Sequence, residues 1–252
     1  DDTGRLLAHG VIHPIPPKAK EDEAKQTLHK LIDDHGVEIV AVGNGTASRE
    51  VHQFVRNWLK EAGLTVQHLV VNESGASVYS ASELARKEFP DLDLTRRSAI
   101  SIARRYQDPL AEFVKIEPKS IGVGQYQHDV NQTRLKQSLD RTVESCVNFV
   151  GVDLNRASGP LLRYVSGITP ALAQRIVEHR DAQGPFATRQ GLLEVSGMGV
   201  KTFEQAAGFL RIPDSSEPLD ASAVHPERYT LVQRMATDHE VSVPELLGNE
   251  SV

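Results

Sequence analysis

The sequence predicts an α/β domain in its first half and an all-α domain in its second half. In the first half, strand-like and helix-like segments alternate, which implies right-handed crossovers and parallel neighbouring strands. The second half holds a tandem repeat: residues 151–212 match themselves at an offset of thirty, with residues 165–168 (VSGI) opposite residues 195–198 (VSGM). A chain of 252 residues with 39% hydrophobic content can bury the cores of two small domains.

The α/β half divides into five predicted elements. Alternating polar and apolar residues over 5–13 predict an edge strand. Apolar residues spaced three and four apart predict helices over residues 21–35 and 48–62. Buried strands are predicted within residues 38–45 (EIVAVGNG) and 64–71 (LTVQHLVV).

The second half is predicted to be helical. A connection rich in Gly and Pro leads to a long helix over residues 131–150, whose apolar stripe includes Cys146, so this cysteine is predicted to fill a core. Each repeat then forms a helix, a tight turn and a second helix, and Pro170 takes the first position of one such helix. A further helix is predicted over residues 225–239, followed by a short last one.

These elements predict four segments along the chain. They are an α/β domain over 1–116, a connection and helix over 117–150, a hairpin domain over 151–212, and an acidic helical extension over 213–252. The last segment holds eight acids and two arginines, which accounts for the whole net charge of −6. Any nucleic-acid site must therefore be a local patch rather than a global basic field.

Cysteine content and hydropathy predict the cellular compartment of the protein. A single cysteine excludes an intramolecular disulfide and favours a reducing compartment. Neither a membrane-length apolar run nor a signal peptide occurs in this sequence, which predicts a cytoplasmic protein. The missing initial Met and an opening turn with no strand before it predict a piece of a longer protein.

The two glycine turns of the repeat resemble the helix-hairpin-helix motif, which implies sequence-non-specific binding to nucleic acid. Such a turn leaves backbone N–H groups free at a helix start, where they and the helix dipole can hold a phosphate oxygen. Arg175 and Lys201 lie just inside the second helices and could add charge-assisted contacts. Thr169 stands where the motif has its second glycine, which weakens the first turn. The predicted contact residues are Gly167, Ile168, Thr169, Arg175, Gly197, Met198, Gly199 and Lys201.

Two observations weigh this binding hypothesis against a plain packing role. Helical hairpins closed by glycine also occur as packing units, but two copies at a fixed spacing favour binding. Residues 151–212 carry seven basic and five acidic side chains, so the expected binding is weak and sensitive to salt.

Polar groups follow the two predicted parallel strands, where ligands gather in such sheets. A loop of Gly43, Asn44, Gly45 and Thr46 could hold an anion, although a βα turn with Thr46 or Ser48 as helix N-cap explains the same residues. Glu73 places a carboxylate after the second strand. Asp108 before Pro109 is either a site residue or an ordinary N-cap.

Residues 70–158 (VVNESGAS to VDLNRAS) and 219–229 (LDASAVHPERY) resemble the Tex family of bacterial transcription accessory proteins. The resemblance implies a YqgF-type, RNase H-like domain followed by tandem helix-hairpin-helix motifs. Related nucleases such as the RuvC resolvases set carboxylates around Mg²⁺ or Mn²⁺. Glu73 and Asp108 would be two of these, and the third, on a first strand, is absent from this sequence.

Three functions follow in order of preference. The first is a nucleic-acid-binding module for DNA or RNA that needs no cofactor, with RNA polymerase or other transcription components as partners implied by the resemblance. The second is a metal-dependent nuclease using Glu73 and Asp108. The third makes the hairpins a protein-docking surface in a transcription complex.

Overall fold

The computed structural model describes residue 1 and residues 4–248, and the chain divides between residues 123 and 124 into two compact units. In the N-terminal unit, β1 (Ile39–Gly43) pairs in parallel with β2 (Gln67–Val71), with Ile39 opposite Gln67 and Gly43 opposite Val71. The helix α2 (Ser48–Glu61) connects the two strands. The parallel pair and its crossover helix confirm the predicted α/β class.

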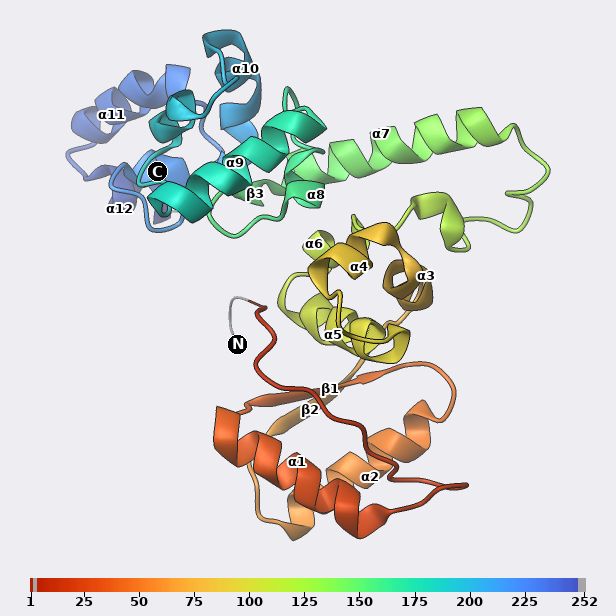
Figure 1. The fold of residues 1–252 in the computed structure, drawn as a ribbon. Helices are drawn as coiled ribbons and strands as arrows, with labels where there is room; N and C mark the ends of the chain where they lie inside the picture. The colour runs from red at the N-terminus through yellow and green to blue at the C-terminus, as the bar shows by residue number, and fades with distance from the viewer. Residues whose placement is uncertain (2–3, 249–252) are drawn as a thin grey trace. The chain divides into compact units, whose positions relative to one another are not determined.

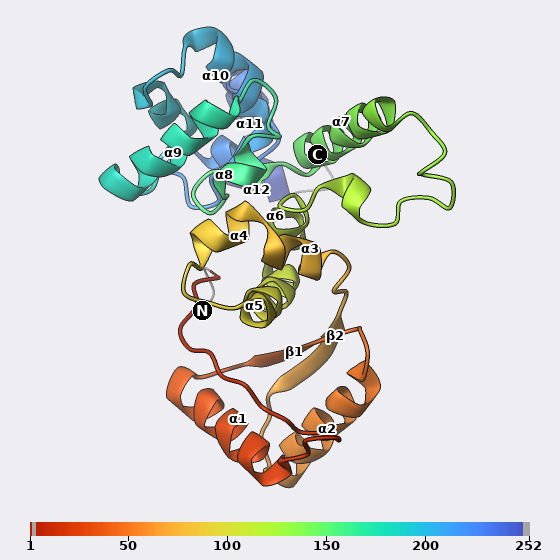
Figure 2. The same cartoon turned by 45° about the vertical axis from the view of Figure 1, so that its right-hand side comes forward.

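Helices cover the strand pair on two sides, as Figures 1 and 2 both show. On one side α1 (Glu21–His35) and α2 close a core in which Val42, Val55 and Trp58 are buried. On the other side lie the short helices that follow β2. These are α3 (Ala76–Ala81), α4 (Glu83–Glu88), α5 (Leu94–Gln107) and α6 (Pro109–Phe113), followed by a 3-10 turn at Pro118–Ser120.

The prediction of an edge strand over residues 5–13 was wrong, because this segment joins no sheet. It is held instead through side chains and turns: Arg104 Nε donates to the carbonyl of Gly4 at 2.7 Å, and Lys20 N donates to the carbonyl of His13 at 2.7 Å. Alternation of residue types creates a strand only where a neighbouring strand supplies the hydrogen bonds.

A buried network of charges joins α3, α4 and α6. The Tyr79 hydroxyl donates to Glu88 at 2.5 Å, and Lys115 Nζ lies 2.7 Å from a Glu112 carboxylate oxygen and 3.1 Å from one of Glu88. Burial, supported by the bond to Glu88, raises the pKa of Tyr79 far above its usual value. The paired charges therefore lie beside the apolar cluster of Tyr79, Ala85 and Ile116 in the same helical layer.

The second unit, called here the hairpin unit, begins with α7 (Gln132–Val150) and continues as short helices. Two short strands that the sequence did not predict, β3 (Val152–Asp153) and β4 (Leu210–Arg211), pair in parallel and join the two ends of the repeat. The remaining elements are α8 (Gly159–Leu162), α9 (Pro170–Gln183), η2 (Arg189–Glu194), α10 (Val200–Ala206), η3 (Ala207–Phe209), η4 (Pro218–Ala221), η5 (Pro226–Arg228), α11 (Tyr229–Asp238) and α12 (Val243–Gly248).

The long helix α7 was predicted correctly, but the prediction that Cys146 fills a core was wrong. Cys146 is exposed, Phe149 is 90% exposed, and Val147 is the one α7 residue that is fully buried. The apolar stripe was read correctly as a helical pattern. Periodicity defines a face of the helix but not what covers it, and within the hairpin unit the covered face is centred on Val147.

Candidate nucleic-acid interface

The two hairpins of the repeat have the same turn geometry. Hairpin one comprises α8, its turn and α9, and hairpin two comprises η2, its turn and α10. Gly167 and Gly197 both adopt positive φ angles, 83° and 89°, which glycine tolerates better than any other residue. In each turn the next amide closes the loop: Ile168 N donates to Val165 O at 3.0 Å, and Met198 N donates to Val195 O at 2.9 Å.

Ile168 and Met198 face the core rather than the surface. Their exposed fractions are 5% and 7%, and each backbone N–H is already used inside its own turn. Both residues were predicted to contact nucleic acid. In the structure their side chains instead pack each turn against the core of the hairpin unit. The other predicted contact residues, Gly167, Thr169, Arg175, Gly197, Gly199 and Lys201, are exposed.

Each turn packs against the second helix of the other hairpin. A Cβ added to Gly167 would lie 3.0 Å from Gln205 Cβ on α10, and one added to Gly197 would lie 2.7 Å from Arg175 Nη1 on α9. Gln205 and Arg175 are themselves thirty residues apart, as the two glycines are. The repeat in the sequence therefore corresponds to a pseudo-two-fold arrangement in space. The positive φ angles favour glycine at both positions, and at Gly167 the Cβ of Gln205 also leaves little room for a side chain.

The equivalence fails at the start of the second helices. In hairpin one, Thr169 is the N-cap of α9, and its Oγ1 accepts from Leu172 N at 3.3 Å. In hairpin two, Gly199 is the N-cap of α10 and offers no capping side chain. Among the described residues, no hydrogen-bond acceptor reaches the amides of Gly199, Val200 or Lys201. These amides are available to a ligand. In hairpin one, Pro170 at the position of Val200 has no N–H, and Thr169 caps the amide of Leu172, whose match Thr202 has no side-chain cap.

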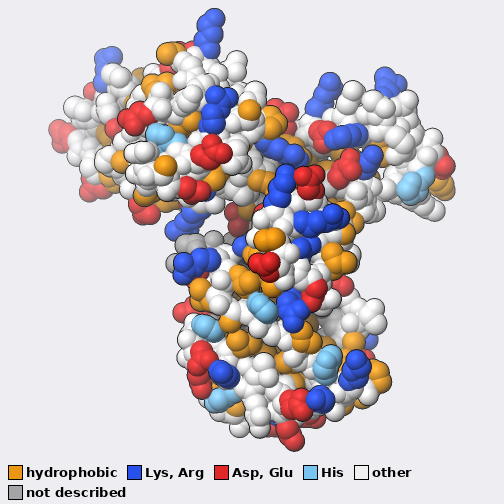
Figure 3. Space-filling model, viewed as in Figure 1, with side chains coloured by type: hydrophobic (Ala, Val, Ile, Leu, Met, Phe, Trp, Pro, Cys, Tyr) orange, Lys and Arg blue, Asp and Glu red, His pale blue; other side chains and the backbone are white. Residues whose placement is uncertain are grey.

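The two hairpins also differ in charge, and hairpin two is the more positive. Lys201 in hairpin two corresponds to Ala171 in hairpin one, and the Arg175 guanidinium lies on the turn of hairpin two where the neutral Gln205 lies on that of hairpin one. Both cations are exposed and neither has a carboxylate partner among the described ion pairs. Figure 3 shows basic and acidic side chains interspersed over the hairpin unit, so this pair of cations is a local patch.

Hairpin one is anchored to α7 by Asn148, a residue that no sequence pattern singles out. The Asn148 side chain accepts from Ser166 N at 3.0 Å and donates to the carbonyl of Tyr164 at 3.0 Å. A side-chain amide that matches a donor and an acceptor of one turn is recognisable only when helix and turn are seen together.

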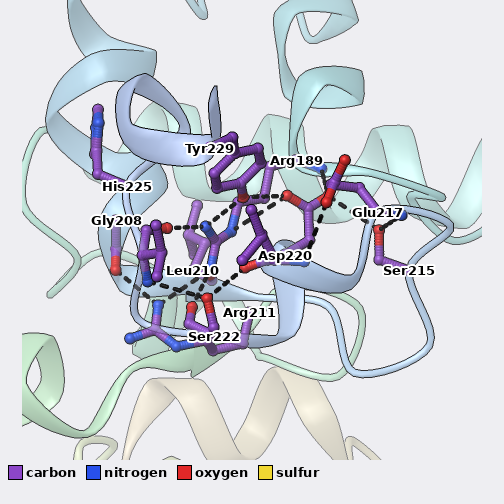
Figure 4. Close-up of polar contacts among 12 residues, drawn as sticks. Arg189, Gly208, Leu210, Arg211, Ser215, Glu217, Asp220, Ser222, His225 and Tyr229 are labelled. Carbon is purple, nitrogen blue, oxygen red and sulfur yellow. Dashed lines mark hydrogen bonds and ion pairs between the residues drawn. The ribbon is translucent and has the colours of Figure 1, made fainter. Parts of the chain in front are cut away.

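Hairpin two is anchored by the segment that follows it in the chain, after residue 212 (Figure 4). Arg189, the first residue of η2, is fully buried, and its guanidinium donates to the carbonyl of Val224 at 2.7 Å and to the Tyr229 hydroxyl at 2.8 Å. Asp220 accepts from Arg189 N at 2.8 Å and from the Tyr229 hydroxyl at 2.5 Å. Burial lowers the pKa of Arg189, while Tyr229 and Asp220 oppose that shift. The acidic extension thus braces the hairpin domain.

In the N-terminal unit, the glycine loop after β1 is filled by a carboxylate of the chain itself. A Cβ on Gly43 or Gly45 would overlap the carboxylate of Glu73, and Glu73 N donates to Asn44 Oδ1 at 3.0 Å. The two glycines therefore make room for Glu73. Neither alternative cap is present, since the N-cap of α2 is Ala47 and neither Thr46 nor Ser48 caps the helix with its side chain.

Glu73 is held in place from both sides of its loop. Arg105 Nη1 donates to the carbonyls of Asn72 and Ser74 at 2.7 and 2.9 Å, which flank Glu73. Asp108 Oδ1 accepts from Ala111 N at 2.8 Å, as expected of an ordinary N-cap of α6. In the part of the chain that the structure describes, no three His, Cys, Asp or Glu side chains come together as metal ligands.

No helix among residues 4–248 is both long and apolar enough to span a bilayer.

Comparison with known proteins agrees with this architecture. Residues 1–107 match the family described as Tex protein YqgF-like domain, and residues 147–211 match the helix-hairpin-helix motif. Residues 217–252 match a family described as HHH domain. The sequence predicted only an acidic helical extension here. The match indicates that the short helices of this segment belong to a further domain of the helix-hairpin-helix class.

Similar proteins cover nearly the whole chain. The chain is 56% identical to the transcriptional accessory protein Tex of Neisseria gonorrhoeae over 250 residues, which is 99% of this chain and 32% of that protein. It is 56% identical to protein YhgF of Escherichia coli strain K12 over 252 residues, again 32% of that protein. A human protein named S1 RNA-binding domain-containing protein 1 is 50% identical over 190 residues, 74% of this chain and 19% of the human one.

The chain thus spans about a third of the length of the bacterial relatives it matches. The YqgF-like match falls on the α/β unit, and the helix-hairpin-helix matches fall on the hairpin unit. The finer boundaries at residues 116, 150 and 212 remain predictions. By fold and by sequence, the chain belongs to the Tex family, in the stretch that carries the YqgF-like domain and the helix-hairpin-helix domains.

Proposed function

We propose that this chain binds DNA or RNA through the phosphate backbone, as part of a Tex-like transcription accessory factor, and that hairpin two is the main contact. The observation that carries the proposal is the combination of open amides at Gly199, Val200 and Lys201 with the cations of Lys201 and Arg175. Backbone amides and point charges recognise phosphate without reading a base, so the binding is not sequence-specific. The match to the helix-hairpin-helix family and the Tex relatives support the same class of ligand.

The proposed contact is small. Hairpin one contributes less, because Thr169 uses one amide of α9 for its cap and Ala171 carries no charge. A site of two cations releases few counterions, so its affinity should be modest and should fall with salt.

The test is a salt titration of binding to labelled single-stranded and double-stranded oligonucleotides. Each phosphate that is neutralised adds about 0.9 to the slope of log affinity against log salt on double-stranded DNA. The Arg175→Gln and Lys201→Gln double variant should reduce this slope by up to about 2 and weaken binding to all sequences alike.

The matched control is the Arg134→Gln and Arg141→Gln double variant, which removes the same charge from exposed positions of α7. It should leave the slope nearly unchanged. If the two double variants weakened binding equally, the affinity would depend on the overall charge of the unit and not on Arg175 and Lys201 in particular. Binding that is independent of salt would favour the alternative in which the hairpins dock a protein.

For the N-terminal unit we propose a scaffold role rather than nuclease activity. Glu73 lies against the glycine loop beside Arg105, and Asp108 caps α6, so neither is joined by a further carboxylate among the described residues. Cleavage of branched or single-stranded substrate with Mg²⁺ or Mn²⁺ by the longer Tex protein, lost in Glu73→Gln, would contradict this proposal. RNA polymerase or other transcription components as partners remain a prediction of the family resemblance, and a cytoplasmic location remains a prediction from cysteine content and hydropathy.

A further inference from the structure

Two histidines of the N-terminal unit lie against one another at the boundary between α2 and β2. His52 Nε2 on α2 and His68 Nδ1 on β2 share a hydrogen bond of 2.9 Å, in which one nitrogen donates and the other accepts, and the ring centroids are 4.8 Å apart with an angle of 66° between the planes. Both rings are half-buried. The two residues come from different elements, so packing of the helix on the strand holds the nitrogens together.

This spacing suits two ligands of one metal ion. Neutral imidazole is the commonest protein ligand for late first-row metals, with metal to nitrogen distances of about 2.1 Å. Two nitrogens 2.9 Å apart then subtend about 90° at the metal, which is the angle between neighbouring positions of a square-planar or octahedral complex. The metal ion would displace the proton of the hydrogen bond between the two nitrogens, so that both offer a lone pair.

The surroundings leave room for further ligands. His52, but not His68, lines a cavity of about 500 Å³ together with Asn44, Ser48 and Glu50. Among residues 4–248 no third His, Cys, Asp or Glu completes a ligand group around the pair, so water would fill the remaining positions. An open site of this kind binds more weakly than a closed structural one.

We propose that His52 and His68 form a two-histidine binding site for a late first-row divalent cation, which links α2 to β2. The chemistry selects Ni²⁺ or Cu²⁺ over Mg²⁺ or Ca²⁺, because imidazole suits the former and hard oxygen ligands suit the latter. The site is independent of the proposed nucleic-acid contact, which lies in the hairpin unit.

The first experiment is thermal unfolding of the full chain after chelator treatment, with and without NiCl2. At a metal concentration of about a hundred times Kd, we expect the Tm of the unfolding transition to rise by about 5 °C. The same concentration of MgCl2 should give no rise. His52→Gln and His68→Gln should each abolish the Ni²⁺ effect, because glutamine can keep a hydrogen bond but does not replace imidazole as a ligand.

The matched control is His29→Gln, which removes an exposed histidine on α1 of the same unit and should keep the full shift. A second measurement needs no variant and so does not depend on folding of the substituted chains. At one equivalent of Cu²⁺, electron paramagnetic resonance should show coupling to two nitrogens. No shift in the wild-type chain, a shift retained in His68→Gln, or a spectrum without nitrogen coupling would overturn the proposal.

Discussion

Gly199 offers the sharpest test of phosphate binding, because the structure tolerates a side chain there. Its φ angle is −90°, and a Cβ added to it meets no atom within 4 Å, so a substitution strains neither the backbone nor the packing. A glutamate at this position sets its carboxylate where the phosphate is expected. It also stands at the positive end of the α10 dipole, which favours the folded state by about 0.3–1 kcal/mol.

The cost to binding can be worked out from charge alone. At a separation of about 5 Å and an effective dielectric constant of about 20, carboxylate and phosphate repel by about 3 kcal/mol. Salt at physiological strength screens roughly half of this over that distance. Since 1.4 kcal/mol is a factor of ten in Kd, Gly199→Glu should weaken binding at least tenfold while the chain stays folded.

The assay is fluorescence anisotropy with labelled DNA and RNA at low salt, and two variants serve as controls. Gly199→Gln adds the same bulk without charge and should weaken binding less. Thr169→Asp adds the same charge to hairpin one, where aspartate keeps the N-cap, and its effect should be smaller than that of Gly199→Glu. Unchanged affinity in a folded Gly199→Glu chain would refute phosphate binding at this turn, and equal losses from Thr169→Asp would refute the asymmetry.

Three further predictions concern stability. Gly197→Ala should lower the free energy of unfolding by about 1–3 kcal/mol, measured by urea denaturation, because its φ of 89° disfavours a side chain while the flexible end of Arg175 can move aside; a neutral result would contradict the left-handed conformation of this turn. Arg189→Met should cost about 3 kcal/mol or more by the same measurement, since it leaves Asp220 buried without its cation; a loss below 1 kcal/mol would show that the network is not a brace. Because the pKa of Tyr79 is raised in the folded state, the stability that its protonated hydroxyl contributes is complete below the unfolded pKa of about 10 and is lost as the pH rises above it. The free energy of unfolding should therefore fall less steeply with pH above about 10 in Tyr79→Phe than in the wild type.

The sequence predicted those features that depend on neighbouring residues. Helix spacing located α1, α2 and α7 within one residue, Pro170 marked the start of α9, and the positive φ of Gly167 and Gly197 follows from local turn chemistry. The pairing of β1 with β2 followed from the order of elements, because a strand, helix, strand sequence leaves few topologies.

Features that depend on distant partners could not be predicted in this way. Alternation over residues 5–13 suggested a strand, but no neighbouring strand was there to pair with it. Arg189 looks in the sequence like any surface arginine, and only the approach of Val224, Asp220 and Tyr229 makes it a buried anchor. The glycine loop at Gly43 suggested an external anion, and the carboxylate that fills it is contributed by Glu73, thirty residues further along the chain.

Comparison of the two copies of the repeat distinguishes positions that serve packing from exposed positions that packing does not constrain. Several matched positions are buried in both hairpins, such as Leu162 with Leu192 and Val165 with Val195. The exposed positions differ: Thr169, Ala171 and Gln205 in or on hairpin one are matched by Gly199, Lys201 and Arg175 in or on hairpin two. Because packing constrains only the buried set, nothing in the fold requires the exposed differences to favour one hairpin. All three nevertheless make hairpin two more open or more positive, so a functional demand on that turn accounts for them better than packing does.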